Sequence, residues 1–161
     1  MHTWPQKYTY GASDQEASAS ANGGDYYREY EMGFVLSATV NNLDYASQMD
    51  WLLLGDMNSR SRVDNWYYGY GANSTAFRCQ DVVRNNTNLV DVIAERYPGE
   101  FHSSTYGGSR IDYVYASPSM YGRVRNAMIL TDAWTDPVKD THGTSFYLPS
   151  DHRPILVDFD M

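Results

Sequence analysis

The sequence predicts a single layered α/β domain with a mixed sheet, and three observations lead to this fold class. At 161 residues, with 42% hydrophobic and 15% aromatic residues, the chain has the length and composition of one globular domain around one core. Segments with helical spacing alternate with apolar strands early in the chain. Strands dominate towards its end, which favours helices layered on a mixed sheet.

Charge and cysteine content narrow the classes of function. The formal charge of -8, from 20 acidic and 12 basic residues, disfavours bulk attraction of a polyanion such as nucleic acid. All basic residues except Lys7 and Lys139 are arginines, which suit local bidentate contacts with carboxylate or phosphate. Cys79 is the only cysteine, so an internal disulfide and a cysteine-based metal site are excluded. No apolar run approaches the roughly 20 residues that span a bilayer.

Helical periodicity begins at Asp25, which is expected to cap a helix over residues 25–41. The apolar face of this helix is predicted from residues at spacings of three and four: Tyr27, Tyr30, Phe34 and Ala38. Further helices are expected over residues 75–85 and 89–97.

Four segments are predicted to be strands because they are rich in apolar, β-branched or aromatic residues. They are "DWLLLGD" (50–56), "SRIDYVYAS" (109–117), "RVRNAMIL" (123–130) and "HRPILVDFD" (152–160). The continuous apolar run of the first is typical of a strand covered on both faces.

Two polar side chains follow the first strand directly. Gly55 allows a sharp turn, after which Asp56 and Asn58 are held at the end of a rigid element. A carboxylate there can orient a water molecule, and an amide can hold a phosphate oxygen. The alternative is an Asx turn, in which both side chains only satisfy local backbone groups.

A second pair of candidate residues, Asp151 and His152, precedes the last strand in "SDHRP". Adjacent residues on a strand point to opposite faces, so each needs a partner of its own; alternatively, Asp151 caps a solvated turn. Asp112 is an isolated carboxylate in an apolar strand, where burial requires a partner, and His152 is the expected one. An ion pair of Asp112 with Arg110 or Arg123 is the alternative.

The remaining histidines have less context. His2 is a further candidate, although by position alone it reads as a terminal residue without a function. His102 and His142 are expected in loops, and His142 lies in the segment that leads to "SDHRP", where it could line a site.

In this order, a strand-end His2, "GDMN", "SRIDYV" and "SDHRP" resemble the endonuclease/exonuclease/phosphatase family, whose members include deoxyribonuclease I-like enzymes. The resemblance spans residues 56–159 and reaches back to His2. It implies half of a four-layer α/β/β/α sandwich, with a mixed, mostly antiparallel sheet and helices on one face. Residues 1–161 are accordingly expected to form a single domain, the C-terminal part of a deoxyribonuclease I-like fold.

The resemblance also implies roles for the candidate residues. Asp56 would activate or position the attacking water, and Asn58 would hold the scissile phosphate. Asp112 would orient His152, and His2 would be the second histidine of the site. Asp151 and Asp56 would contribute to a metal site for Mg²⁺ or Mn²⁺.

The chemistry so implied is metal-dependent phosphoester hydrolysis by an activated water. Arg60, Arg62 and Arg110 are basic residues able to contact the substrate phosphate. The acidic charge favours a small phosphodiester, sugar phosphate or lipid headgroup over DNA. The composition is similar to that of exported bacterial proteins, which makes a secreted or periplasmic location an expectation.

The resemblance covers only the C-terminal half of the family's two-halved sandwich. The family's metal-binding Glu and first-strand Asn belong to the other half, so one sheet face is expected to be uncovered. A separate N-terminal half or a second copy of the chain is the expected partner for this face. The alternative to an enzyme is a non-catalytic fragment or interaction module that keeps the sheet and lacks that Glu.

Overall fold

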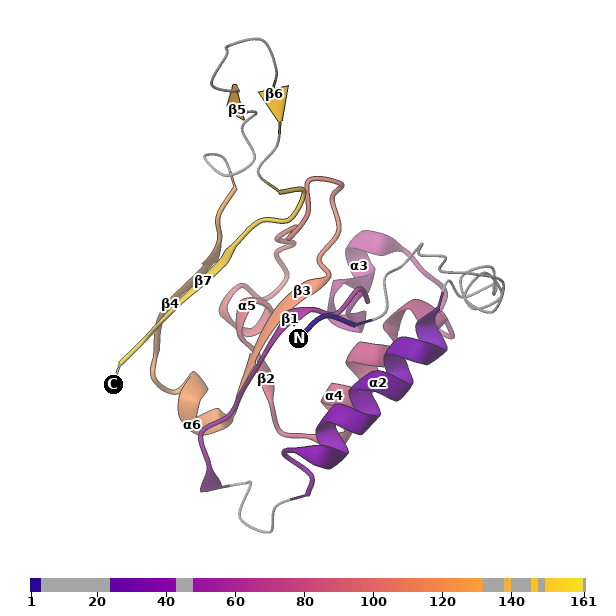
Figure 1. Ribbon diagram of the computed structural model, residues 1–161, viewed down its shortest axis with the longest axis vertical. Helices are drawn as coiled ribbons and strands as arrows, with labels where there is room; N and C mark the ends of the chain where they lie inside the picture. The colour runs from indigo at the N-terminus through magenta and orange to yellow at the C-terminus, as the bar shows by residue number, and fades with distance from the viewer. Residues whose placement is uncertain (4–23, 43–47, 132–137, 140–145, 148–149, 161) are drawn as a thin grey trace.

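The computed structural model describes residues 1–3, 24–42, 48–131, 138–139, 146–147 and 150–160, and these form a mixed α/β fold (Figure 1). The helices, including short 3-10 turns, are α2 (Asp25–Ala38), η2 (Arg62–Asp64), α3 (Asn65–Tyr68), η3 (Thr75–Phe77), α4 (Arg78–Asn86), α5 (Val92–Arg96) and α6 (Pro118–Tyr121). The strands are β1 (Leu52–Asp56), β2 (Val90–Asp91), β3 (Asp112–Ala116), β4 (Val124–Ile129), β5 (Val138–Lys139), β6 (Phe146–Tyr147) and β7 (Ile155–Phe159).

All strand pairs between these elements are antiparallel. The largest sheet has the order β1-β3-β2, while β4 pairs with β7 and β5 with β6. The four predicted strands are thus present as β1, β3, β4 and β7. The helix expected over residues 75–85 is η3 followed by α4, and the segment 89–97 contains β2 and then α5.

β3 connects the two apolar cores because its two faces pack against different elements. Tyr113 and Tyr115 are buried on one face against α2 and α4, which lie side by side in Figure 1. On the other face, Val114 and Ala116 pack with residues of α5, β4 and β7. Asp112 shares this second face, since side chains alternate along a strand.

β1 is less covered than its sequence predicted. Its Leu53 packs against the core formed with α2 and α4, but Leu52 and Leu54 are exposed, Leu54 to 51%. The prediction of a strand covered on both faces is therefore wrong for this chain. The reason is that β4 and β7 cover β3 but leave the neighbouring face of β1 open, which is the uncovered apolar surface that a half sandwich predicts.

The predicted face of α2 is also wrong. The N-cap position is held by Gly24 rather than Asp25, and the buried face carries Asp25, Arg28, Met32 and Leu36. Asp25 pairs with Arg28 and accepts a hydrogen bond from the Thr75 hydroxyl at 2.7 Å. This buried ion pair occupies the inward face, so the aromatic side chains turn outward; Tyr30 is 83% exposed.

The first three residues add a parallel strand segment beside β1. The Thr3 amide donates to the Asp56 carbonyl at 3.0 Å, the Met1 amine donates to the Leu54 carbonyl at 2.7 Å, and His2 forms a β-bridge with Asp56. Gly55 permits this approach, because a Cβ built there would lie 1.9 Å from the Met1 carbonyl oxygen. No helix among the described residues is long and apolar enough to cross a membrane.

Candidate active site

The site begins where β1 ends, at a turn that fixes one carboxylate. Oδ1 of Asp56 accepts a hydrogen bond from the Asn58 amide at 2.8 Å, which is the Asx turn weighed from the sequence. Asn58 has φ 45°, in the left-handed region that Asn tolerates better than most residues. Oδ2 of Asp56 is left facing away from the turn. The local turn and an outward carboxylate oxygen therefore coexist in one side chain.

Asp112 brings a second carboxylate to the same place. It is the direct register partner of Asp56 across β1 and β3, so the two side chains share the face of the sheet opposite α2 and α4. Oδ2 of Asp112 lies 2.9 Å from Nδ1 of His152 and accepts a hydrogen bond from the Ser104 hydroxyl at 2.8 Å. Ser104 is completely buried, so this carboxylate is held in one orientation.

Arginine does not pair with Asp112. Arg110 is buried and bonds to Asp64 and Asp91, at 2.8 Å to each carboxylate, while Arg123 pairs with Asp50 at 3.1 Å. The alternative of an Asp112–arginine pair is therefore not observed.

The pKa of each member of the Asp112–His152 pair is shifted upward. Burial raises the pKa of Asp112, against the hydrogen bond from Ser104 and the charge of His152, which lower it. Burial lowers the pKa of His152, but the charge and hydrogen bond of Asp112, with further contributions from Asp56 and Asp151, outweigh it and raise the pKa above 6.5. The imidazole of His152 therefore keeps its proton to a higher pH than an unperturbed histidine does.

Two histidines converge on one oxygen of Asp56. Nε2 of His2 lies 3.4 Å from Oδ2 of Asp56, and Nε2 of His152 lies 3.9 Å from the same atom. Both distances exceed the usual 2.9–3.0 Å of an N–H···O hydrogen bond. Oδ2 of Asp56 thus lies near both imidazoles without a hydrogen bond of ordinary length to either.

Asn58 and Asp151 lie at different depths around this centre. Asn58 is buried, and its side-chain amide donates to the Thr3 carbonyl at 3.2 Å, which ties the first strand segment to the turn after β1. The Asp151 side chain is 85% exposed, and its Oδ1 lies 4.0 Å from Nε2 of His152. The cap of this turn is Ser150, whose hydroxyl accepts from the His152 amide at 3.0 Å.

The three arginines that the sequence offers for phosphate binding are not equivalent. Arg110 forms a buried ion triad with Asp64 and Asp91, and only 1% of it is exposed. The expectation that Arg110 can contact a substrate phosphate is therefore wrong. Arg62 is held by both oxygens of Asp81, at 3.2 and 2.7 Å. Arg60 makes one long hydrogen bond to the Ser109 hydroxyl, at 3.4 Å.

Asp56, Asp112 and His152 form a donor set that fits a divalent cation. One ligand atom from each residue lies within 4.8 Å of the other two. Carboxylate oxygens are the ligands that Mg²⁺ and Mn²⁺ prefer, while the imidazole also suits other divalent ions. Among the described residues, the ion pairs recorded for the two carboxylates involve only histidines. Excess negative charge at the end of the sheet therefore matches a cation.

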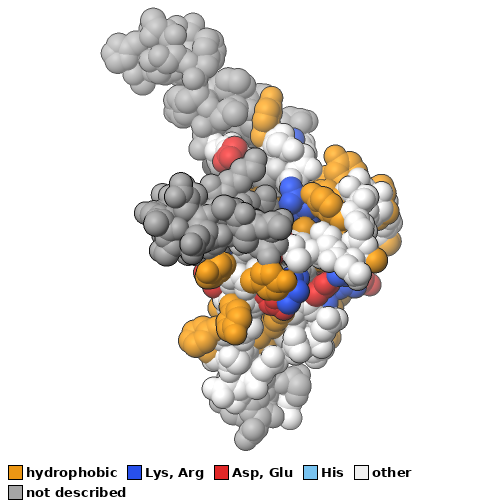
Figure 2. Space-filling view, turned by 90° about the vertical axis from the view of Figure 1, so that its right-hand side faces the viewer, with side chains coloured by type: hydrophobic (Ala, Val, Ile, Leu, Met, Phe, Trp, Pro, Cys, Tyr) orange, Lys and Arg blue, Asp and Glu red, His pale blue; other side chains and the backbone are white. Residues whose placement is uncertain are grey.

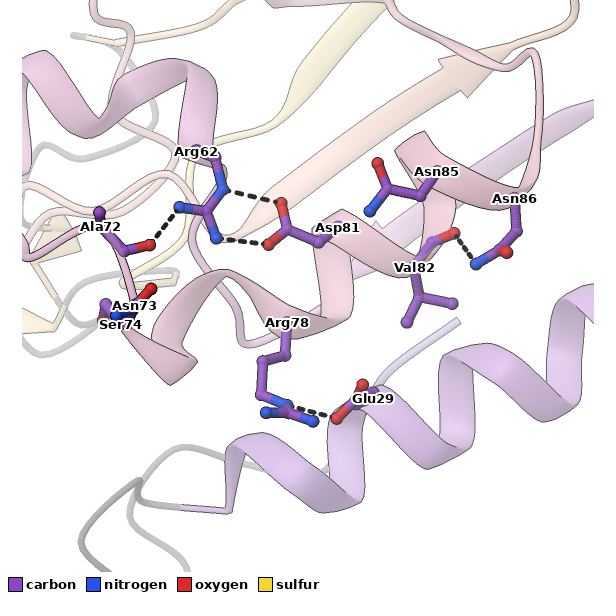
Figure 3. A pocket seen from close by; sticks show the side chains of 10 residues that line it. All are labelled: Glu29, Arg62, Ala72, Asn73, Ser74, Arg78, Asp81, Val82, Asn85 and Asn86. Carbon is purple, nitrogen blue, oxygen red and sulfur yellow. Dashed lines mark hydrogen bonds and ion pairs between the residues drawn. The ribbon is translucent and has the colours of Figure 1, made fainter.

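A large hollow of the described surface lies elsewhere. It has a volume of about 560 Å³ between α2, α4 and the segment 72–74, and none of its lining residues belongs to the centre described above (Figure 3). Its charged residues are paired with one another, Arg62 with Asp81 and Arg78 with Glu29. A smaller hollow of about 220 Å³ adjoins the centre itself, lined by Asp112, Leu54, Val114 and Ile155 among others.

Of the sequence-predicted residues, the structure brings together His2, Asp56, Asp112 and His152, with Asn58 beneath them and Asp151 at the rim. His142 lies outside the described residues. Ser104 was missed, because a serine in the loop "HSSTYGGSR" has no pattern that indicates a buried partner for Asp112. Arg110 was misjudged because its two acidic partners are separated from it along the chain.

Comparisons with known proteins place the fold. No protein-family model matches the sequence, and a search of curated proteins gave no match. Among solved structures, the chain is similar to an AP endonuclease from Archaeoglobus fulgidus, with a TM-score of 0.65 and 17% identity over 98% of this chain and 59% of that one. It is also similar to the 3′ phosphatase NExo from Neisseria bound to product DNA hairpin, with a TM-score of 0.53 and 18% identity over 86% of this chain and 53% of that one.

The chain thus spans less than two thirds of the length of either solved structure. At these identities the likeness concerns the arrangement of the elements. It agrees with what "GDMN", "SRIDYV" and "SDHRP" predict from the sequence. The protein has a deoxyribonuclease I-like fold.

Proposed function

We propose that the protein is a metal-dependent phosphoester hydrolase whose centre is formed by Asp56, Asp112 and His152. The observation that carries this proposal is the convergence of Nε2 of His2 and of His152 on Oδ2 of Asp56, at 3.4 and 3.9 Å. The likeness to an AP endonuclease and a 3′ phosphatase supports the same class of reaction.

Each residue has a role that its contacts support. Asp56 accepts a hydrogen bond from the attacking water through Oδ2, because Oδ1 is held by the Asn58 amide. Asp112 fixes His152 through Nδ1, so that Nε2 presents a proton to an oxygen of the phosphoryl group. His2 provides a second imidazole near Oδ2 of Asp56. Asn58 anchors the strand segment that carries His2, through its hydrogen bond to the Thr3 carbonyl.

A divalent cation, Mg²⁺ or Mn²⁺, would be held by the carboxylates of Asp56 and Asp112 and would supply charge neutralisation at the phosphoryl oxygens, while Nε2 of His152 keeps its proton. Asp151, whose Oδ1 lies 4.0 Å from Nε2 of His152, would add a further carboxylate ligand for the cation at the exposed edge of the centre. The roles of the protein residues given above concern orientation and proton transfer.

The partner of the uncovered face of β1 belongs to this proposal. Leu52, Leu54, Asp56 and Asp112 share one face of the sheet, so whatever covers the two leucines also borders the centre. We propose that a companion sheet, either an N-terminal half or a second copy of the chain, packs there. The substrate is a phosphoester, with a small molecule or lipid headgroup favoured over duplex DNA by the charge of -8.

The test is hydrolysis of bis(p-nitrophenyl) phosphate by the purified chain with Mg²⁺ or Mn²⁺, together with calorimetric titration of Mn²⁺ in the absence of substrate. We expect Asp56→Ala and His152→Ala to lower turnover by at least 100-fold, about what removal of a general acid or base costs. Asp56→Ala should also abolish Mn²⁺ binding. Asp158→Asn is the control, because Asp158 is an exposed carboxylate of β7.

The two readouts separate the enzyme from the interaction module. Mn²⁺ binding that depends on Asp56 but no turnover would mean that the centre is real and the companion sheet is required for activity. Absence of both metal binding and turnover would contradict the hydrolase and favour the non-catalytic reading, for which the exposed leucines of β1 are the specific support.

A further inference from the structure

A polar hollow follows one face of α4, away from the candidate centre. Its volume of about 560 Å³ lies within the roughly 300–1,000 Å³ of pockets that hold small ligands. Glu29 of α2 and residues 72–74 line it from the neighbouring segments. The residues that α4 supplies follow helical spacing, and they are Arg78, Asp81, Val82, Asn85 and Asn86. One face of α4 therefore lines the whole of this first hollow.

The charged residues of the first hollow neutralise one another in pairs. Arg62 binds both oxygens of Asp81 and donates a third hydrogen bond to the Ala72 carbonyl at 2.7 Å. Arg78 pairs with Glu29 in the same way (Figure 3). An anionic ligand would have to displace a carboxylate from its guanidinium, and a cationic ligand would have to displace a guanidinium from its carboxylate. The first hollow therefore suits a neutral ligand better than an anion such as phosphate.

Asparagine is concentrated around this hollow and the one beside it. The second hollow, of about 380 Å³, shares Asn85 and Asn86 with the first. A side-chain amide presents a donor and an acceptor next to each other, and so does a pair of hydroxyl groups. Half of the ten asparagines in the chain line the two hollows, namely Asn41, Asn73, Asn85, Asn86 and Asn88. This lining complements a ligand that is rich in hydroxyl groups.

The first hollow combines fixed side chains with amides that have no other partner. Within the described part of the chain, no hydrogen bond of the Asn73 or Asn85 side chain is recorded, and no dashed line reaches either of them in Figure 3. Asn86 is held in place because its side-chain amide donates to the Val82 carbonyl at 2.8 Å. Arg62 is held by its three hydrogen bonds. A ligand therefore meets walls that lose little conformational freedom on binding.

The second hollow adds an aromatic surface. Trp51 lines it and packs against the core formed with α2 and α4. The backbone of Trp51 is bonded to Ser117 in both directions, since its amide donates to the Ser117 hydroxyl at 3.1 Å and its carbonyl accepts from the Ser117 amide at 2.9 Å. A pyranose ring carries C–H groups on its faces and hydroxyl groups at its rim. It can therefore pack a face on the indole and bond to the amides through its rim.

From these contacts we infer that the two hollows along α4 form a binding site for a neutral oligosaccharide. This site is separate from the proposed phosphoesterase centre, because none of its lining residues belongs to the group of Asp56, Asp112 and His152. Figure 2 looks onto the side where α2, α3 and α4 lie. Lys and Arg side chains are next to Asp and Glu there rather than gathered in a patch of one sign, which agrees with a neutral ligand.

The experiment titrates the full chain with three neutral tetrasaccharides, cellotetraose, maltotetraose and chitotetraose, and follows binding by NMR. We expect at least one of them to bind with a Kd below about 1 mM and to shift the side-chain amide signals of Asn73 and Asn85. Asn85→Ala should weaken that binding about 2- to 12-fold, the effect of losing one hydrogen bond. Alanine favours a helix, so this variant keeps α4 intact.

Asn42→Ala is the matched control, because Asn42 is an exposed asparagine that lines neither hollow. Its affinity for the tetrasaccharide should equal that of the wild type. No binding of any of the three at about 10 mM, equal affinities of Asn85→Ala and Asn42→Ala, or shifts confined to residues outside the two hollows would each overturn the inference. Inorganic phosphate that shifts the Asn85 amide at a lower concentration than the saccharides do would overturn it in favour of an anion site. Hydrolysis takes no part in this measurement, so a chain without phosphoesterase activity gives the same answer.

Discussion

Asp56 and Asp112 stand directly opposite each other across β1 and β3, so two carboxylates face the same side of one sheet. Like charges in directly opposed strand positions destabilise a sheet. Among the described residues, their recorded ion pairs are with His2 and His152 only. Carboxylates that are held close together at such a cost are typical of sites for chemistry or ion binding.

The first prediction concerns the proton on His152. Its pKa is raised above 6.5, so the stabilisation from its charged pair is complete below pH 6.5 and is lost as the pH rises through the folded-state pKa. Asp112→Asn removes the largest upward contribution, and the pKa of His152 should fall. NMR titration of the imidazole measures this. Asp151→Asn is the comparison and should lower the pKa less, because Asp151 is exposed and 4.0 Å away; an equal fall in both variants would contradict the assignment.

The second prediction concerns the buried ion triad. Arg110→Ala leaves Asp64 and Asp91 without their common cation, and breaking a buried pair in this way costs about 3–5 kcal/mol. Arg123→Ala removes an exposed pair with Asp50 and should cost about 0–1 kcal/mol. Urea unfolding followed by circular dichroism compares the two. Similar free energies of unfolding for the two variants would show that the triad does not hold the start of β3.

The third prediction tests how His2 is placed. Gly55 has φ 141°, and a Cβ there would collide with the Met1 carbonyl, so Gly55→Ala should displace residues 1–3 from β1. Amide hydrogen exchange at Thr3 should become faster by at least tenfold as its bond to the Asp56 carbonyl is lost. In Gly71→Ala, where a Cβ meets nothing within 4 Å, the exchange at Thr3 should not change.

The fourth prediction concerns the uncovered face of β1. The exposed Leu52 and Leu54 should drive association of the 18.4 kDa chain at micromolar concentration, as measured by analytical ultracentrifugation. Leu54→Glu should return it to a monomer, since a charge on this face cannot be buried unpaired. Phe34→Glu changes an exposed ring on α2 and serves as the control. A wild-type monomer under these conditions would contradict the predicted use of this face.

Much of the fold could be predicted from local patterns. The apolar run before "GDMN" and the alternating strands around Asp112 and after His152 gave the correct elements, since strand periodicity depends on neighbouring residues. The isolated Asp112 indicated a partner, and its contact with His152 at 2.9 Å has the distance of a hydrogen bond. The physical argument was sound because a carboxylate on an apolar strand needs compensation.

The rest depends on contacts between segments that are far apart in the sequence. The inward face of α2 could not be predicted, because Asp25 and Arg28 are buried only as a pair that also contacts Thr75. Periodicity assigns such charges to the surface and the tyrosines to the core, which is the reverse of the structure. Ser104 was missed and Arg110 was misjudged for the same reason, since their partners are set by the tertiary fold.

The two oxygens of the Asp56 carboxylate have different partners: Oδ1 holds the turn after β1, and Oδ2 faces the two imidazoles. An asparagine in its place retains an oxygen for the Asn58 amide and so keeps the turn, but it replaces the oxygen that faces the imidazoles by an amide nitrogen. One nucleotide change in an aspartate codon produces this substitution. A variant that keeps the turn and lacks only this one charge is therefore a single mutation away.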